Sequence, residues 1–329
     1  MRCGPASMVL LLLVFVAPVP PVARAGETSN DEGEVAGILG PRRAPDGITL
    51  APALAALQIG ARVDGLRLLP PFEVVKGTMI RHPDYDETDG LYPIQLALAD
   101  DGKTIRGFHL SFFGTEKEEL IARRWGPGRP TFTKYGPNGR IWFDARRGLR
   151  ATSLRIVLMR DGEGIRRTVV HVVPCMPLDE WIGAPGRPFG FETIPLLGAK
   201  VAEVVKAFGL PPFGDEVSMM VVPLACTEIG GDDGTLRANL YVKNDRVWAT
   251  EVSIDAQWDR RQLAVLLSRL RAKLGRGHKA PHPWRDRRKS PSVSEAFEGP
   301  LRAHLSVRDA QLELVTFAPG EDVGSTTPP

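Results

Sequence analysis

The chain of 329 residues has few cysteines, few aromatic residues and almost no excess of charge of either sign. It contains 3 Cys, 7% Phe, Trp and Tyr, and 42 Lys and Arg against 39 Asp and Glu. Nucleic acid is bound by a basic protein surface, so this balance gives no electrostatic case for a nucleic-acid partner. With 43% hydrophobic residues, the chain still has ample material for a folded core of one or two domains.

Long apolar runs are also missing, except at the N-terminus. Residues 1–25 combine Arg2, an apolar run of about a dozen residues and the small-x-small sequence Ala23-Arg24-Ala25, which is typical of a secretory signal peptide. The run is shorter than the roughly 20 residues that cross a bilayer, and no later segment approaches that length. We therefore expect cleavage near Ala25 and an exported bacterial protein, periplasmic or extracellular, without a transmembrane segment. The alternative is a retained N-terminal anchor.

Only Cys175 and Cys226 would remain after this cleavage. In an oxidising compartment an isolated pair of cysteines favours a disulfide, here closing a loop of about 50 residues. The alternatives are two buried free thiols or a catalytic cysteine. No Cys-x-x-Cys motif and no nearby acid–base partner supports the catalytic reading.

One phrase occurs twice, 138 positions apart: IGARVDGLRLLPPF at 59–72 and LGAKVAEVVKAFGLPPF at 197–213. The second copy predicts a helix that Gly209 can end with positive φ and that the two following prolines cannot continue. Its apolar positions fall on one face, which would cover a sheet: Val201, Val204, Val205 and Phe208. We expect the first copy to form the same helix.

The same succession of elements follows each copy. A first strand and an acidic turn lead to a hairpin, which turns at Asp100-Asp101-Gly102 in one half and at Asn244-Asp245 in the other. A helix is predicted next, at 115–126 and at 259–275. Two or three further strands end each half.

These two helices carry different signals. The first begins with Thr115 and has Glu118 three residues on, which is a capping-box pattern. The second has a one-sided apolar stripe that Gly275 ends. The stripe consists of Leu263, Leu266, Leu267, Leu270 and Leu274.

We therefore predict an α+β protein of two similar halves, each an antiparallel sheet covered on one side by helices. The first repeat would span 47–174 and the second 195–318. The linker between them, 175–194, contains Trp181, Phe189 and Phe191, so we expect it to lie on the surface of one half. The segments 26–46 and 319–329 are polar and rich in Gly and Pro, and we expect them to be mobile.

The repeated phrase, followed by a three-strand antiparallel meander, resembles the helix-plus-sheet units of the β-lactamase-inhibitor-protein-like and outer-membrane SmpA/OmlA-like families. Residues 197–212 match best, whereas 59–71 lack the glycine before the prolines. The resemblance covers about a sixth of the chain and concerns the fold. It implies binding of a protein through a sheet face and supplies no catalytic residues.

Motifs of known chemistry are scarce. There is no Gly-x-Ser-x-Gly sequence and no nucleotide-binding glycine loop. His278 and His282 are four apart, but they lie among Gly and Pro, so a stiff loop is favoured over a zinc site. The acidic segment at 82–90 lacks the ligand pattern of a calcium loop. We predict no metal and no cofactor, and we expect most histidines in the strands to point at solvent: His109, His171 and His304.

The candidate binding residues are aromatic and basic. Trp284 precedes a basic cluster that could contact phosphate, a lipid headgroup or an acidic protein patch, with a solvated hairpin tip as the alternative. The cluster consists of Arg285, Arg287 and Arg288 with Lys289. In the first half the corresponding candidate is the hairpin that carries Tyr135 and Trp142.

Taken together, these features predict an exported, non-enzymatic module that binds a protein or cell-envelope component. One alternative is a purely structural envelope protein. Another is a secreted hydrolase whose site is assembled from dispersed residues. A deep pocket with converging histidines and carboxylates would favour the hydrolase, and a shallow face with exposed apolar groups would favour binding.

Overall fold

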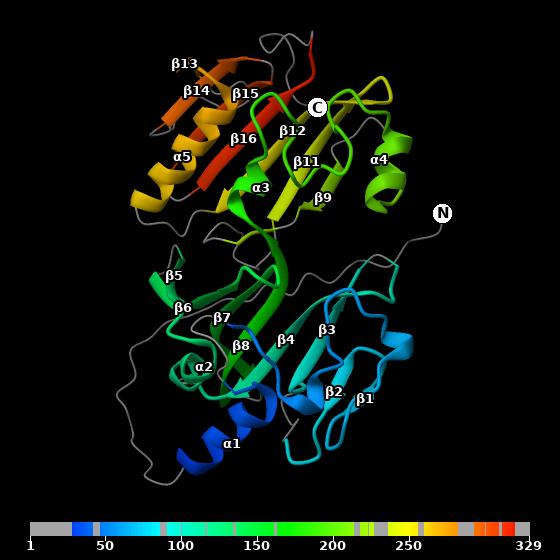
Figure 1. Ribbon diagram of the computed structural model, residues 1–329, viewed down its shortest axis with the longest axis vertical. Coiled ribbons are helices and arrows are strands. Elements are labelled where there is room, and N and C mark those ends of the chain that lie inside the picture. The colour runs from blue at the N-terminus through cyan, green and yellow to red at the C-terminus, as the bar shows by residue number, and fades with distance from the viewer. Residues whose placement is uncertain are drawn as a thin grey trace.

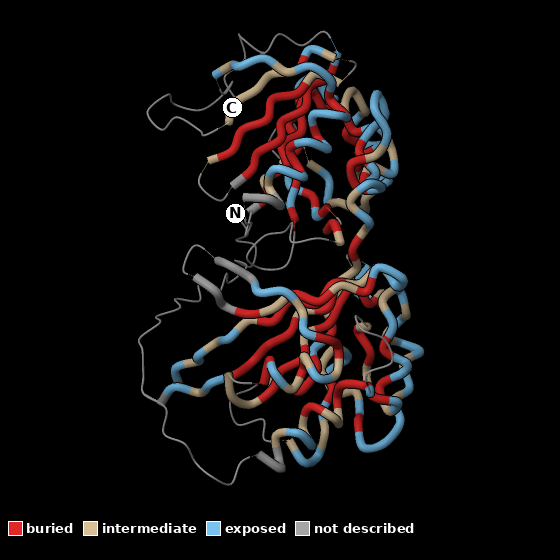
Figure 2. The backbone as a smooth tube through the Cα atoms, turned by 60° about the vertical axis from the view of Figure 1, so that its left-hand side comes forward, coloured by how far each residue is buried: buried red, intermediate tan, exposed pale blue. Residues whose placement is uncertain are grey.

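The computed structural model describes residues 28–41, 47–85, 91–99, 101–115, 117–133, 136–160, 163–213, 218–222, 224–226, 236–255, 260–281, 293–299, 301–308 and 311–319. Their backbone forms two largely antiparallel sheets and a small number of helices (Figure 1). This confirms the predicted α+β class. Each sheet has its own buried core, and the buried strands are visible as red tubes in Figure 2.

The first sheet has nine strands, eight of them in the order β1-β2-β3-β4-β8-β7-β6-β5. They are β1 (Glu73–Val75), β2 (Met79–Arg81), β3 (Ile94–Leu98), β4 (Ile105–Phe113), β5 (Arg129–Thr133), β6 (Gly136–Asp144), β7 (Leu149–Arg160) and β8 (Glu163–Met176). The helix α2 (Glu118–Trp125) joins β4 to β5. Its Ile121 and Trp125 pack into the core of this sheet with Phe108 and Leu110 of β4.

The second sheet has seven strands in the order β13-β14-β15-β16-β12-β11-β9. They are β9 (Ser218–Val222), β11 (Leu236–Lys243), β12 (Arg246–Asp255), β13 (Gly277–Lys279), β14 (Val293–Glu298), β15 (Arg302–Arg308) and β16 (Gln311–Phe317). The helices α3 (Leu178–Ile182) and α4 (Val201–Phe208) precede it, and α5 (Arg260–Leu274) joins β12 to β13. None of the helices in the described part of the chain is long and apolar enough to cross a bilayer.

The two sheets share one strand order. In each, three antiparallel strands lead to a helix, four more strands follow, and the last strand returns to pair with the third. Thus β2, β3, β4 and β5 to β8 of the first sheet correspond to β9, β11, β12 and β13 to β16 of the second. The hairpin partner β1 is an addition to the first sheet.

The repeated phrase makes the same backbone hydrogen bonds in both units. The N–H of Gly60 donates to the carbonyl of Ile105 in β4, and the N–H of Gly198 donates to the carbonyl of Val247 in β12, both at 2.8 Å. In each unit the N–H of that strand residue donates back to the alanine after the glycine. Both glycines have positive φ, 89° and 81°, which a residue with a side chain rarely adopts. The phrase therefore recurs because it anchors the chain to the third strand.

The second copy of the phrase continues into a helix, as predicted. α4 ends at Gly209, which is in the left-handed region with φ 64°. The first copy forms a 3₁₀ turn at Val63–Gly65, so the prediction of a helix there is wrong. Six residues separate its valine from the first proline, against nine in the second copy, and Gly65 disfavours a helix in so short a segment.

The two connecting helices form where the sequence predicts them. The leucine stripe of α5 faces the core, with Leu270 fully buried, and Gly275 follows the helix with φ 93°. The predicted capping box of α2 is wrong, because Lys117 precedes the helix and its side chain makes no capping bond. Glu118 instead accepts hydrogen bonds from Ser153 (2.8 Å) and Arg155 (2.6 Å), which tie α2 to β7.

Part of the N-terminal segment, which was predicted to be mobile, forms a helix. Residues Thr28–Ile38 form α1, and Val35 and Ile38 are buried against the first core. Lys117, itself buried, forms ion pairs with Asp31 and Glu34 of α1. Two ion pairs and two buried apolar side chains hold this helix, and they give no periodic pattern in the sequence. Residues 1–27, 42–46 and 320–329 lie outside the described part of the chain.

The linker is part of the second core, so the predicted boundary at 195 is too late. Trp181, Phe189 and Phe191 are at most 4% exposed and pack against one another. Lys273 of α5 holds this segment in place. Its Nζ donates to three carbonyl groups within 3.2 Å, those of Ala184, Arg187 and Pro188.

Replacing Lys273 with methionine is expected to loosen this segment. The change leaves three carbonyl groups without their cationic donor, which costs about 2 kcal/mol of stability. Chymotrypsin should then cleave after Phe189 faster than in the wild type, as followed by mass spectrometry of early fragments. The matched control is Lys206→Met, an exposed lysine on α4. Equal cleavage rates in the two variants would show that Lys273 does not restrain the linker.

The strand β8 continues from the first sheet into the second unit (Figure 1). Its last residues, Cys175 and Met176, pair in parallel with β10 (Leu224–Ala225). A disulfide joins Cys175 to Cys226, which confirms the predicted pairing.

The double variant Cys175→Ser, Cys226→Ser tests what this disulfide contributes. The bond closes a loop of 51 residues, for which the chain-entropy account gives about 4 kcal/mol of stabilisation. Urea unfolding followed by tryptophan fluorescence should show a free energy of unfolding lower by that order. No measurable loss would mean that packing alone fixes the end of β8.

Candidate functional site

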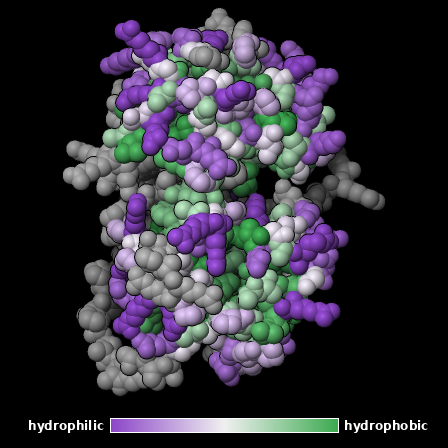
Figure 3. Space-filling model, viewed as in Figure 1, coloured by the Kyte–Doolittle hydropathy of each residue, from purple (hydrophilic) through white to green (hydrophobic). Residues whose placement is uncertain are grey.

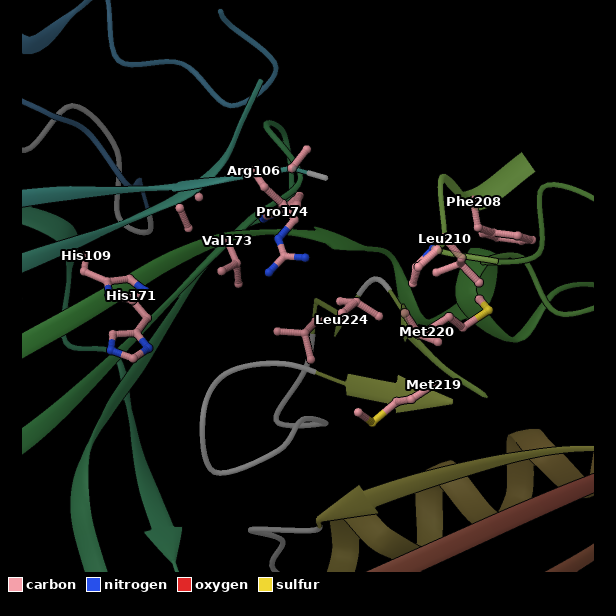
Figure 4. Close-up of a pocket in the computed structure, with 16 residues that line it drawn as sticks. Arg106, His109, His171, Val173, Pro174, Phe208, Leu210, Met219, Met220 and Leu224 are labelled. Atoms are coloured by element: carbon pink, nitrogen blue, oxygen red, sulfur yellow. The ribbon is translucent and has the colours of Figure 1, made fainter. Parts of the chain in front are cut away.

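A cleft of about 460 Å³ lies between the two units, and both units line it (Figure 4). The first unit contributes β3, β4 and β8, and the second contributes the end of α4, the segment after it, β9 and β10. The space-filling view shows apolar surface, in green, between the upper and lower units (Figure 3). This volume is typical of a small-molecule site.

Uncovered apolar side chains form the wall from the second unit. Successive residues of a strand point to opposite faces, so Met220 and Val222 of β9 enter the core while Met219 and Val221 face outward. These two residues are 54% and 45% exposed, and β9 lies at the edge of its sheet. Leu224 continues the same apolar lining. Apolar surface left open beside a cavity favours an apolar ligand.

The floor of the cleft is open because its paired residues are small. Ala97 of β3 lies directly opposite Gly107 of β4. A Cβ on Gly107 would lie 2.7 Å from the carbonyl oxygen of Val172, so a larger residue does not fit there without a backbone shift. Gly107 therefore allows β4 to approach β8 closely, and its lack of a side chain leaves space in the cleft.

Two histidines line the cleft one row further along the same sheet face. His109 and His171 are direct cross-strand partners, and their rings stack 4.0 Å apart at 8°. Burial, with a smaller effect of His171, lowers the pKa of His109 to about 4. His109 is therefore neutral at pH 7. The prediction that strand histidines mostly point at solvent is wrong, since His304 is also buried.

Arg106 brings a positive charge into this apolar space. Its side chain extends from β4 into the cleft and is partly buried (Figure 4). Among the described residues it has no ion pair and no side-chain hydrogen bond. A partly desolvated guanidinium is stabilised by an anion, above all by a carboxylate or phosphate that accepts two hydrogen bonds.

Of the aromatic and basic residues predicted for binding, Trp142 lies in the described part of the chain. Trp142 is 3% exposed, packs edge-on against Trp125 and donates from Nε1 to the carbonyl of Gly126 at 2.9 Å. It therefore belongs to the core rather than to a binding surface. The other candidates lie outside the described residues: Tyr135, Trp284, Arg285, Arg287 and Arg288.

The sequence did contain one signal for the cleft. The strand SMMVV is apolar at four successive positions, whereas a strand with one face in water alternates. Such a run indicates apolar surroundings on both faces. The position of Arg106 and the stacking of the histidines depend on strand register, which the sequence does not specify.

The cleft offers binding groups more than catalytic ones. Its described lining contains no Ser, Cys, Asp or Glu, so the lining itself supplies neither a nucleophile nor a carboxylate. Within the described part of the chain, no three His, Cys, Asp or Glu side chains converge as a metal site. Comparisons with protein-family models, curated proteins and solved structures give no match.

The burial of His109 predicts a specific pH dependence of stability. Its pKa is about 4 in the folded protein against 6.5 for a free histidine. Above pH 6.5 both states are neutral, so the effect is absent there. Between pH 6.5 and 4 the unfolded state gains the proton first, which removes up to roughly 3 kcal/mol of stability.

Denaturant unfolding at several pH values tests this for wild type and His109→Gln. The variant should lose less stability than the wild type as the pH falls through this window, because it lacks the titrating group. Parallel curves for the two proteins would contradict the assigned burial of His109.

Proposed function

We propose that this is an exported, non-enzymatic binding protein that holds an apolar ligand in the cleft between its two units. The observation that carries the proposal is the exposure of Met219 and Val221 beside a cavity lined by both sheets. Export is supported by the signal-like residues 1–25 and by the disulfide, which an oxidising compartment favours.

We also infer that the two units are copies of one ancestral unit, with helices on one face of each sheet. The shared strand order and the repeated glycine hydrogen bonds support this inference. The divergence between the copies then builds the cleft. The longer second phrase, with its helix, places Phe208, Leu210 and Pro211 in the lining. The resemblance to inhibitor-like binding units stays a prediction that agrees with this function.

The hydrolase alternative has less support. It requires an attacking group, an activated water or a general acid beside the histidines, and the described lining of the cleft has no carboxylate or hydroxyl. Binding requires only the apolar walls that are present.

Fluorescence titration with N-phenyl-1-naphthylamine, an uncharged apolar probe, tests the proposal. The wild type should bind it saturably, and Val221→Asp should weaken binding about tenfold or more, because a carboxylate would be desolvated against the probe. The matched control is Val157→Asp. Val157 has the same 45% exposure but lies on β7, outside the cleft. Equal affinities of the two variants would contradict binding in the cleft.

A further inference from the structure

We propose that the ligand of the cleft is an amphipathic anion, an apolar chain that ends in one carboxylate or phosphate group held by Arg106. This inference rests on the proposed binding function and adds the chemical class of the ligand. It follows from the division of the cleft into an apolar wall and a polar wall.

The apolar wall belongs to the second unit and fits an alkyl chain. Met219, Val221 and Leu224 follow one another along its lining, with Leu210 beyond the end of α4. Methionine is flexible and polarisable, so such a wall adapts to chains of different shape. The volume of about 460 Å³ limits the occupant to a small molecule or a single chain.

The polar wall belongs to the first unit and fits an anionic head. Arg106 is the charged residue of the described lining, and it has no counter-ion among the described residues. Burial lowers the pKa of His109, so this residue is neutral at pH 7 and adds no charge to the wall. The cleft therefore presents the guanidinium of Arg106 beside an apolar wall, which matches a molecule with one negative end and an apolar body.

Val173 and Pro174 of β8 lie between these two walls. They lie where β8 passes from the histidines of the first unit toward Leu224 of the second (Figure 4). A ligand that uses both walls would contact both units at once. Its head would lie toward β4 and its chain along β9.

The test compares dansyl-labelled undecanoic acid with its methyl ester, which differ only in the charge of the head. The wild type should bind the acid about ten- to a hundredfold more tightly, the range expected for a hydrogen bond to a charged group. Arg106→Gln should lower the affinity for the acid to that for the ester and leave the affinity for the ester unchanged. Arg106→Lys should restore part of the preference for the acid over the ester.

The matched control is Arg166→Gln. Arg166 is exposed on β8, lies outside the cleft and has no ion pair among the described residues. Arg166→Gln should keep the wild-type preference for the acid over the ester. Competition by dodecanoate and by dodecyl phosphate then distinguishes a fatty-acid head from a phospholipid-like head.

The outcomes separate this inference from the proposed function. If acid and ester bind equally to the wild type, the apolar site stands and the recognition of an anion is wrong. If neither binds, the proposed function itself fails. Displacement of the acid by a capped apolar peptide, equally in wild type and Arg106→Gln, would favour addition of a strand to β9 and contradict the inference.

A second variant, which fills the cavity, tests the inference even if Arg106→Gln does not fold. Ala97 is partly buried in the floor of the cleft, and Ala97→Phe should occupy the space of the ligand while leaving the two cores intact. Both probes should lose affinity by more than tenfold with an unchanged unfolding midpoint. Unchanged binding of both probes to this variant would place them elsewhere on the protein and overturn the inference.

Discussion

The arrangement of the two units depends on β8, which belongs to both. Along most of its length it pairs with β4 and β7 in the first sheet, and at its end it pairs with β10 of the second unit. A strand extends by about 3.3 Å per residue and resists further stretching, so this continuity sets the separation of the units. The disulfide at Cys175 then fixes the end of the strand. Val173 and Pro174 line the cleft at the point where β8 passes between the units.

The second constraint is the docking of the repeated phrase. A glycine with positive φ allows the chain to exchange two backbone hydrogen bonds with the third strand of each sheet. Beyond this anchor the copies differ, since the first turns at once and the second forms α4. An anchored segment can change its length without disturbing the sheet. The difference between the copies is what supplies one wall of the cleft.

The parts of the fold that local chemistry determines were predictable from the sequence. Asn244 and Asp245 both adopt positive φ in the hairpin between β11 and β12, as their turn chemistry requires. The stripe of α5 and the stop at Gly209 follow from helix geometry alone. The short strands β5 and β13 were missed because three to five residues carry too little periodicity.

Most of the candidate site could not be predicted from the sequence, because tertiary contacts form it. The stacking of His109 on His171 joins positions 62 apart through strand register. Arg106 lacks a counter-ion within the described residues only because of where β4 lies relative to the second unit. The aromatic residues of the linker illustrate the same limit, since composition predicted a surface segment and packing made it part of a core.

Photo-crosslinking with an alkyl carboxylate that carries a diazirine in its chain tests the location of the site most directly. Mass spectrometry of the labelled protein should place the crosslinks on β9, at Met219 to Val222, and on β8 at Val173 and Pro174. Excess unlabelled dodecanoate should suppress them. Crosslinks confined to the outer surfaces of α2 or α5, or spread over the protein and insensitive to the competitor, would contradict a ligand site between the two units.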